Sequence, residues 1–472
     1  MGGQPSSVSR LSKKINSIVP PGKKGLDTGF LIQSLDKRDT LYERAADKLL
    51  VPASVAKLFT TYTALKRLRP TSTFKTQVYV NGNIKDGLLV GDLYLKGGGD
   101  PSLVSERLWM LVNDLVRSGI KTINGNITAD SSFFDGESKP GTRPKYLKDQ
   151  AYNAPIGALS FNFNTTTIYV SPGDAVGASP TVYTDPENSY IDIANQATTG
   201  KGGSANSLQV SRTDFVKGDI GDTILLRGSI PLGSSELRFY RNIVNPALYT
   251  AHMFKAFWEQ RGLKFTGRIV EGSTPDSARK ILEFESLPLW QVVWGMNKFS
   301  NNFVADQILK KVAAEVWGPP GSLQKGIAAI EDTLDRIGIP AKSYQIKDGS
   351  GLTRETKVTA RQIMKVLTAL YNDFAIAPEA LSSLGVAGED GTLKKRLPSN
   401  TDERIIRAKT GSLDGVNSLA GFTTTRDGER VAFAFLLNDP KMLYGRMIPW
   451  IDQMTLAVGE FSRGKTDRGE GK

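Results

Sequence analysis

The spacing of apolar residues near the N-terminus predicts two strands followed by a helix. Apolar and polar residues alternate over 28–36 and again over 40–44, as they do in half-buried strands. From residue 53 to about residue 69 the apolar residues recur at helical spacing, and Pro70 ends this pattern because proline cannot continue a helix. The chain therefore begins with mixed α/β character.

The middle of the chain has a β-rich pattern. Between residues 71 and 170, alternating apolar residues are separated by the turn sequences NGN, KDG and GGGD, which predict hairpins. The stretch 171–240 has more Gly, Ser, Thr and Pro and shorter apolar runs, so we interpret it as a small β module. A helix over 247–262 and one further strand are expected after it.

From residue 283 onward the apolar spacing is mainly helical. Two strands are then predicted, 417–425 and 430–438, joined by a polar turn, and a last helix contains Trp450. The tail 462–472 is polar and rich in glycine, so we expect it to be disordered.

These patterns predict a mixed α/β, multidomain chain, because 472 residues exceed what one hydrophobic core usually supports. The N- and C-terminal parts are expected to form one domain that is interrupted by a mostly β insertion. The predicted boundaries are 1–69 with 283–472 for the outer domain, 70–170 with 241–282 for the inserted domain, and 171–240 for a small β domain nested within it.

Charge and hydropathy limit the class of protein. The chain has 60 Lys and Arg against 48 Asp and Glu, but its basic residues are scattered among acids, which argues against a nucleic-acid interface. No run of about 18 apolar residues predicts a membrane span, so at most peripheral association with a membrane surface or an anionic polymer is expected. The N-terminal residues lack the apolar core of a secretory signal, which leaves open a cytosolic protein or one whose signal has been removed.

Cysteine and histidine limit the chemistry further. The absence of cysteine excludes thiol nucleophiles, Cys-ligated zinc and disulfides. The one histidine, His252, lies in a predicted amphipathic helix, where we expect an ordinary packing role. No metal and no other cofactor is therefore predicted, and a serine enzyme of this sequence would need a base other than histidine.

Ser54 and Lys57 are the first candidate catalytic pair. A separation of three residues places both side chains on one face of a helix, and Pro52 marks a helix start, where the dipole favours developing negative charge. A lysine acts as a base only when burial or a nearby cation lowers its pKa. The spacing alone is weak evidence, because it recurs elsewhere, for example at Ser72 and Lys75.

Two further motifs follow in order. Ser300 and Asn302 form a Ser-x-Asn triplet, and Lys409-Thr410-Gly411 lies just before the last predicted strand pair. Ser-x-x-Lys, a Ser-x-Asn triplet and Lys-Thr-Gly are together typical of penicillin-recognising serine enzymes. The three motifs in this order are far more specific than any one of them, and Lys409 supplies a second cation.

On these motifs the chain resembles the class C, low-molecular-mass penicillin-binding proteins, the D-alanyl-D-alanine carboxypeptidase/endopeptidase family. The resemblance covers nearly the whole chain. It is carried by PASVAKL (52–58), LKGGGDPSL (95–103), ITADSSFF (127–134), SNN (300–302), DGSGLTR (348–354) and AKTGSLDGV (408–416). It implies a transpeptidase/β-lactamase-like catalytic domain, with an antiparallel sheet flanked by helices, split by inserted domains between the first two motifs.

The resemblance also implies the central roles. Ser54 is expected to attack the carbonyl of a D-Ala–D-Ala or D-Ala–diamino-acid bond, and Lys57 to accept its proton. Ser300 is expected to relay a proton to the leaving amine and Asn302 to hydrogen-bond the peptide. Lys409 is expected to hold the terminal carboxylate of the substrate.

Residues after Lys409 are expected to bind the same end of the substrate. Thr410, Gly411 and Ser412 are the predicted contacts, and the backbone N–H groups of Ser54 and Ser412 would form the oxyanion hole. The strand that contains them is expected to take the peptide by β-augmentation.

Three further positions are candidates whose role is open. Asp130 matches a family aspartate that faces the amine of the substrate, but a turn-capping role is an equal alternative. Arg354 matches a family arginine near the stem peptide, and a structural role in its loop is the alternative. Asp414 stands where relatives often have a neutral residue, so its charge is expected to alter the preference for the amine or carboxylate end.

The sequence thus predicts a periplasmic serine DD-peptidase that acts on peptidoglycan stem peptides as carboxypeptidase and endopeptidase and is acylated by β-lactams. A serine β-lactamase is the rival enzyme, although no loop with a dedicated deacylating glutamate is evident. A catalytically silent peptidoglycan-binding scaffold is the non-enzyme alternative, although every expected catalytic side chain is present. The oligomeric state and the balance between the two peptidase activities stay open.

Overall fold

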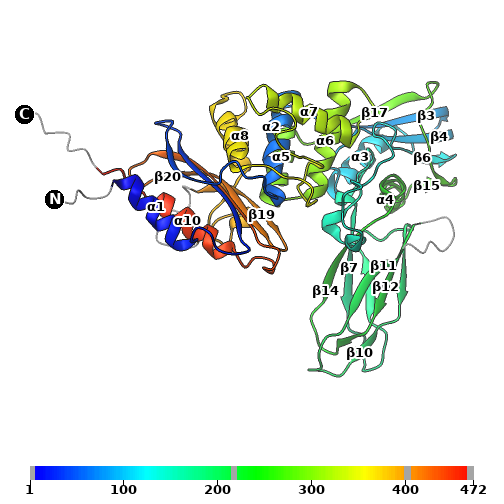
Figure 1. Cartoon of the computed structure of the whole chain (residues 1–472). Coiled ribbons are helices and arrows are strands. Elements are labelled where there is room, and N and C mark those ends of the chain that lie inside the picture. The colour runs from blue at the N-terminus through cyan, green and yellow to red at the C-terminus, as the bar shows by residue number, and fades with distance from the viewer. Residues whose placement is uncertain (1–5, 214–220, 398–405, 465–472) are drawn as a thin grey trace, which may run out of the picture. The chain divides into compact units, whose positions relative to one another are not determined.

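The computed structural model describes residues 6–213, 221–397 and 406–464 (Figure 1). The chain divides into two compact units. The first contains Met1–Thr71, Leu289–Ala305 and Ile327–Lys472, and the second contains Ser72–Pro288 and Asp306–Gly326. The first unit is therefore interrupted in sequence, and residues 306–326 group with the second unit rather than with the outer segments in which the sequence analysis placed them.

The first unit is built on one six-stranded antiparallel sheet with the strand order β18-β19-β20-β21-β1-β2. Its strands are β1 (Asp27–Ser34), β2 (Thr40–Arg44), β18 (Gly385–Val386), β19 (Arg407–Leu413), β20 (Val416–Thr424) and β21 (Arg430–Asn438). The N-terminal strand β1 pairs along its whole length with β21 near the C-terminus. The four strands predicted at the two ends of the chain are thus confirmed, and the pairing of β1 with β21 joins them in one open sheet.

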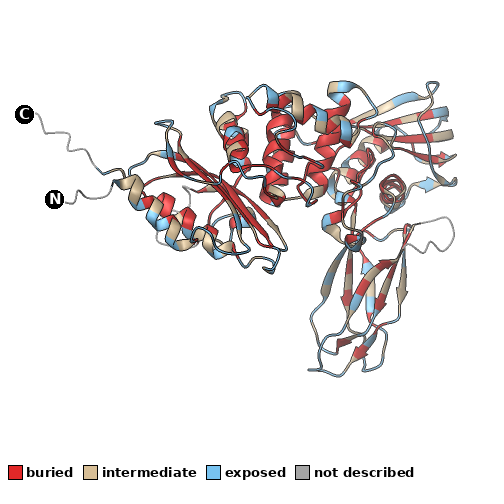
Figure 2. Cartoon of the chain, viewed as in Figure 1, coloured by how far each residue is buried: buried red, intermediate tan, exposed pale blue. Residues whose placement is uncertain are grey.

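Helices cover both faces of this sheet, which explains why β20 and β21 are buried almost throughout instead of alternating (Figure 2). On one face α1 and α10 pack with sheet residues in a shared apolar core; α8 packs on β1 and β21 and contacts α2. The helical elements of this unit are α1 (Ser7–Ile18), η1 (Ala53–Ala56), α2 (Lys57–Leu68), α5 (Leu289–Lys298), α8 (Ala360–Asn372), α9 (Ala377–Ser383), η5 (Gly391–Leu393) and α10 (Ile448–Gly459). Two more, α6 (Asn302–Trp317) and α7 (Leu323–Asp335), cross the division between the units.

The second unit contains a seven-stranded sheet with the path β15-β5-β4-β3-β17, in which β6 pairs with β4 and β16 pairs with β6. Its elements are β3 (Lys75–Lys85), β4 (Leu88–Gly97), α3 (Ser105–Arg117), β5 (Thr122–Asn124), β6 (Ile127–Asp130), α4 (Pro246–Gln260), β15 (Lys264–Phe265), β16 (Ile269–Glu271) and β17 (Arg279–Glu285). The helices α3 and α4 bury their apolar faces against the sheet in one core.

Three small sheets lie within the same unit. They are formed by β7 (Thr165–Ser171), β8 (Thr181–Thr184), β9 (Ile191–Asn195), β10 (Thr198–Gly200), β11 (Gln209–Thr213), β12 (Asp222–Arg227), β13 (Ser229–Pro231) and β14 (Leu237–Asn242). They share a separate apolar cluster that includes Ile168, Val170, Ile224 and Leu226. The short strands expected over 171–240 are therefore present, and the independent domain proposed for them stays a prediction.

Two helical features differ from the sequence analysis. The helix expected from residue 53 begins as the short 3₁₀ turn η1 and becomes α-helical only at Lys57. The helix α1 was not predicted; its buried residues are Leu11 and Ile15, and Ser6 caps it by accepting from the N–H of Ser9.

Of the tail expected to be disordered, residues 465–472 lie outside the described residues. Within the described ranges, each helix is too short or too polar to traverse a lipid bilayer.

Candidate active site

Ser54 lies in the 3₁₀ turn η1 at the start of α2, and the backbone before it is unusual. Ala53 has φ +48°, in the left-handed region that residues with a side chain rarely adopt. The carbonyl of Pro52 accepts from the Ser418 hydroxyl of β20 at 2.5 Å and from the N–H of Val55 at 3.3 Å. The turn is therefore held by the sheet, and helix propensity alone does not explain it.

Lys57 is the first residue of α2, and it is completely buried. Its Nζ lies 2.9 Å from Ser54 Oγ, 2.7 Å from Asn302 Oδ1 and 2.7 Å from the carbonyl oxygen of Ser350. A neutral amine can donate its two N–H groups to these two carbonyl acceptors and turn its lone pair toward the serine hydroxyl. This geometry allows Lys57 to accept the proton of Ser54.

The loop that carries Ser350 is fitted closely to the nucleophile turn. Gly351 has φ +73°, and a Cβ placed there would lie 2.1 Å from the carbonyl oxygen of Ala53. Asp348 accepts from the N–H of Gly351 at 2.6 Å and from the Ser350 hydroxyl at 3.1 Å. The sequence analysis used this DGSG segment as a family marker and missed that the Ser350 carbonyl contacts Lys57.

Lys409 and Ser300 form a second pair. Lys409 is completely buried in β19, and its Nζ donates to Ser300 Oγ and to the carbonyl of Thr410, both at 2.9 Å. Ser300 has φ +55°. Burial, and in second place the charge of Lys57, lower the pKa of Lys409 well below its usual value. Lys409 therefore holds its proton less tightly than an exposed lysine does, and the expectation that Lys409 stays the charged partner remains a prediction.

Gly411 allows β19 to lie directly against the nucleophile turn. A Cβ at this position would lie 2.2 Å from Ser418 Oγ and 2.4 Å from the carbonyl of Pro52. The neighbouring strand β18 pairs only with Arg407 and Ala408, so β18 does not cover the edge of β19 beyond them. The Lys-Thr-Gly motif thus combines a required glycine with a strand edge that can receive an extended peptide.

The hydroxyls that follow Lys409 are held by residues that the sequence analysis did not single out. Thr410 Oγ1 lies 2.7 Å from Thr392 Oγ1 of η5, and Ser412 Oγ accepts from Asn417 Nδ2 at 3.0 Å. Thr392 follows a GEDG turn that resembles an ordinary loop, so the sequence offers no signal for this contact.

Arg354 and Asp414, both exposed, meet through the backbone. Arg354 Nη2 donates to the carbonyl oxygen of Asp414 at 2.5 Å, in the turn between β19 and β20. The structure thus places both candidates in the same unit as the serine–lysine pair, with the Asp414 carboxylate on the surface.

Asp130 belongs to the second unit and is completely buried at the end of β6. Its two oxygens accept from the N–H groups of Ser132 at 2.9 Å and Thr274 at 2.7 Å, and Lys96 Nζ lies 3.8 Å away. Burial acts to raise the pKa of Asp130, but these hydrogen bonds outweigh it and hold the pKa below its usual value. This is the turn-capping geometry of the alternative role.

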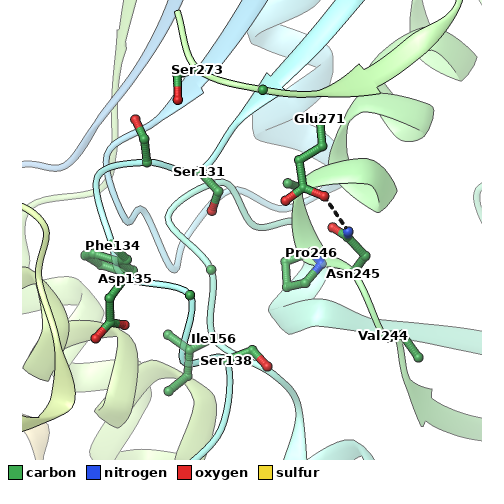
Figure 3. A pocket seen from close by; sticks show the side chains of 15 residues that line it. Ser131, Phe134, Asp135, Ser138, Ile156, Val244, Asn245, Pro246, Glu271 and Ser273 are labelled. Atoms are coloured by element: carbon green, nitrogen blue, oxygen red, sulfur yellow. Dashed lines mark hydrogen bonds between the residues drawn. The ribbon is translucent and has the colours of Figure 1, made fainter.

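The loop after Asp130 lines a cavity of about 500 Å³ in the second unit (Figure 3). Polar side chains face it from three segments, and several of them are already engaged. Asn245, the N-cap of α4, donates to Glu271 at 2.8 Å, and Asp135 pairs with Lys310 at 2.5 Å. Its lining contains no serine–lysine pair like that of the first unit.

The described residues offer no cluster of three or more His, Asp or Glu side chains that could hold a metal ion. His252 is buried on α4, where its Nδ1 lies 2.8 Å from Ser189 Oγ. Burial, and to a lesser degree Lys255, lower the pKa of His252 to about 4. The ring is therefore neutral near pH 7 and packs in the core of the second unit, as expected.

Comparison with known proteins decides the family. The model of the D-Ala-D-Ala carboxypeptidase 3 (S13) family matches residues 11–453. The chain belongs to this family. The match spans both units and all three motifs, so the serine–lysine pair described above lies in a serine peptidase of the S13 family.

Individual S13 relatives agree over nearly the full length. A D-alanyl-D-alanine carboxypeptidase from Actinomadura sp. is 31% identical over 450 residues, which cover 91% of this chain and 81% of the relative. The D-alanyl-D-alanine carboxypeptidase DacB from Haemophilus influenzae is 27% identical over 439 residues, which cover 92% of this chain and 88% of the relative.

A solved S13 structure shares the fold. The crystal structure of penicillin binding protein 4 from Haemophilus influenzae superposes with a TM-score of 0.80 and 25% identity over 95% of this chain and 98% of that one. The same protein in complex with a β-lactam superposes with a TM-score of 0.75. The predicted mixed α/β, multidomain fold is thus confirmed.

Proposed function

We propose that this protein is a serine DD-peptidase that hydrolyses D-Ala–D-Ala and D-Ala–diamino-acid bonds in peptidoglycan stem peptides. Membership of the S13 family supports the reaction class. The observation that carries the assignment of residues is the distance of 2.9 Å between Lys57 Nζ and Ser54 Oγ, on a lysine that is completely buried.

The acylation step follows from this geometry. Ser54 Oγ attacks the carbonyl carbon of the terminal peptide bond while Lys57 accepts the hydroxyl proton. The oxyanion is stabilised by the N–H groups of Ser54 and Ser412, and removal of one such donor typically costs about 3 kcal/mol. When the C–N bond breaks, the proton that Lys57 accepted passes to the departing amine by way of Ser300, whose hydroxyl is hydrogen-bonded to Lys409. The products are an acyl-Ser54 ester and a free D-amino acid or amine.

Deacylation completes the cycle. A water molecule attacks the ester carbonyl, its proton passes to the Ser54–Lys57 pair, and the shortened peptide leaves with a new carboxylate. A β-lactam acylates Ser54 by the same first step. Because opening of its ring leaves the departing nitrogen tethered to the acyl group, we expect slow release of the β-lactam from Ser54.

The substrate end is assigned to the residues around β19. Lys409 and Thr410 bind the terminal carboxylate, and Asn302 binds the peptide next to the reacting bond. Arg354 and Asp414 lie together on the surface beside β19 and are proposed to contact the stem peptide. Asp130 is proposed to face a substrate amine, although its buried hydrogen bonds also fit the capping role.

The polymer substrate leads to two further proposals. Carboxypeptidase and endopeptidase action use the same bond type, so we propose that the enzyme performs both. Since its substrate lies outside the inner membrane, we propose that the protein works in the periplasm.

Penicillin labelling tests the mechanism. A fluorescent penicillin should label wild-type protein covalently, and Ser54→Ala should abolish labelling without changing the circular dichroism spectrum. Phe374→Ala serves as a control, because this side chain is 92% exposed. Failure of folded wild-type protein to label would support a silent scaffold, and rapid hydrolysis of the penicillin would support a β-lactamase.

Digestion of purified sacculi tests the substrate. Muropeptide analysis should show loss of terminal D-Ala from pentapeptides and conversion of cross-linked dimers to monomers. Unchanged dimers would exclude the endopeptidase activity and leave the carboxypeptidase in place.

A further inference from the structure

The helix that leads to Ser300 carries aromatic side chains on the surface. Trp290 and Trp294 of α5 are each 37% exposed, and Phe299, directly after the helix, is 69% exposed. We call these three residues the α5 aromatic ridge. Trp290 and Trp294 are four positions apart and so share one face of the helix. Phe299 immediately precedes Ser300, so the ridge extends to the catalytic motif.

Contacts with neighbouring residues hold part of the ridge in place. Trp294 and Phe299 meet edge to face with ring centroids 6.0 Å apart. Lys298 lies 5.7 Å from the centre of the Trp294 ring, and its buried ammonium pairs with Asp390 at 2.6 Å. The backbone N–H of Trp290 donates to the carbonyl of Pro70 at 3.0 Å, which fixes the start of the helix. Both indoles are partly buried, and that of Trp294 is restrained by its neighbours, so little of its side-chain entropy is lost when a ligand binds.

A glycine leaves open space beside this platform. Gly295 lies inside α5, where glycine is less favourable than alanine by about 1 kcal/mol. A Cβ at this position would meet no atom within 4 Å outside its chain neighbours. Close packing therefore does not require the glycine, and its effect is to keep the surface next to Trp294 clear.

We infer that the α5 aromatic ridge binds the glycan strand of peptidoglycan. This inference rests on the proposed function, because the stem peptide that reaches Ser54 is attached to a polymer of amino sugars. The C–H groups on a pyranose face stack on the electron-rich face of an aromatic ring. The cation on this face, Lys298, is already paired with Asp390, so the ridge presents neutral ring faces that suit an uncharged sugar better than a polyanion.

The position of the ridge favours the glycan over the peptide. An extended stem peptide is expected along β19, which follows Lys409, whereas the ridge enters the site from Ser300 on α5. Lys409 Nζ and Ser300 Oγ are 2.9 Å apart, so the two approaches meet at the reacting groups. A sugar bound on α5 would keep the attached peptide at high effective concentration near Ser54.

Binding to purified sacculi by co-sedimentation tests the inference, with Ser54→Ala in every protein so that nothing is cleaved. The double substitution Trp290→Ala and Trp294→Ala should weaken binding by about tenfold, as expected for two lost stacking contacts. Gly295→Gln should weaken it similarly, because the new side chain covers the platform. Since glutamine is the better helix former, this variant should unfold no more easily than its parent. Phe374→Ala, which removes a more exposed aromatic ring elsewhere, should bind normally.

Competition separates sugar from peptide. Glycan strands stripped of their peptides by an amidase should displace the parent protein from sacculi more effectively than cross-linked peptides free of sugar do. The assay is run at about 1 M salt, which screens the lactyl carboxylates that the amidase exposes. With Ser54 restored, the activity of the double variant on sacculi should fall to about one tenth of the wild-type value, whereas its activity on a soluble pentapeptide should be unchanged.

Several results would overturn the inference while leaving the proposed function intact. One is normal penicillin labelling of Ser54 together with unchanged sacculus binding in both ridge variants. Another is displacement by peptides but not by glycan strands. A third is a change in sedimentation coefficient on mutating the ridge, which would mean that it joins two copies of the chain. Absence of labelling in the parent enzyme would instead refute the proposed function itself.

Discussion

Backbone strain lies next to two of the reactive side chains. Ala53, which precedes the proposed nucleophile Ser54, and Ser300 both have positive φ, a conformation that costs roughly 1–3 kcal/mol for residues other than glycine. The surrounding hydrogen bonds maintain it: Pro52 is tied to Ser418, and Ser300 to Lys409. Part of the folding free energy therefore offsets this strain, and the strained backbone fixes the orientation of the Ser54 and Ser300 hydroxyls.

Thr392 tests how far this positioning extends beyond the three motifs. Thr392→Val removes the hydroxyl 2.7 Å from Thr410 but keeps the shape of the side chain. The rate constant for penicillin acylation should fall by about fivefold, which corresponds to one lost hydrogen bond of about 1 kcal/mol. Thr63→Val is the matched control, because within the described residues its buried hydroxyl has no hydrogen-bond partner. Equal rates for the two variants would mean that Thr392 does not orient Thr410.

His252 predicts a pH-dependent stability. The unfolded ring takes a proton near pH 6.5, whereas the folded one does so only near pH 4, so the unfolded state binds more protons between these values. The free energy of unfolding of the second unit should therefore fall by about 3 kcal/mol as the pH drops from 6.5 to 4. His252→Gln should not show this loss, so the difference between variant and wild type in urea unfolding should change with pH. A constant difference across this range would contradict the assignment.

The motif side chains could be predicted from the sequence, whereas their partners could not. Ser54, Lys57 and Lys409 stand out because their types and order are chemically informative. Ser350 contributes a backbone carbonyl, which any residue possesses, so no side-chain pattern indicates it.

At the scale of elements, close contact between η1, β19 and the DGSG loop builds the site. Gly411 and Gly351 each replace a side chain that would collide with the backbone of residues 52–53. The two glycines therefore set the distances at which Lys409 and the Ser350 carbonyl reach the serine–lysine pair.

Gly351→Ala tests this contact. The new Cβ would lie 2.1 Å from the carbonyl of Ala53, at a φ of +73°, so the loop must move and take the Ser350 carbonyl with it. Acylation of Ser54 by penicillin should fall by about 100-fold, as is typical when a catalytic group is displaced by about 1 Å. Gly141→Ala, whose Cβ would meet no atom within 4 Å, should acylate normally. A rate for Gly351→Ala within twofold of wild type would show that the loop is not fitted to the turn.

Elements were predictable where their pattern reflects burial, and less so where other segments impose the conformation. The strands β1, β20 and β21 have apolar runs that their buried positions explain. The 3₁₀ turn at Ser54 has the apolar spacing of the helix that follows, and its conformation is set by contacts with β19, β20 and the DGSG loop.

At the scale of the whole molecule, the net charge of +12 favours contact with an anionic polymer. Binding of the Ser54→Ala protein to sacculi should weaken as salt rises from about 10 mM to about 1 M, because the screening length falls from about 30 to about 3 Å. The deficit of the ridge variants relative to their parent should keep the same factor at each salt concentration, since stacking is not screened. A deficit that disappears at high salt would mean that the ridge acts through charge.

The long separation between the first two motifs predicts an insertion, and the domain boundaries given for it stay a prediction. The two compact units divide within helix α6, between residues 305 and 306. Because an uninterrupted helix shows one continuous apolar pattern, the sequence contains no boundary there.

Discontinuity of the first unit has a consequence for biosynthesis. Ser54 is made before its partners: Lys57 contacts Asn302, the second amine is at position 409, and β1 cannot pair with β21 until residues 430–438 exist. A nascent chain that lacks residues 409–438 is thus expected to be inert toward peptide bonds, because the proposed site is assembled only after these residues have been made.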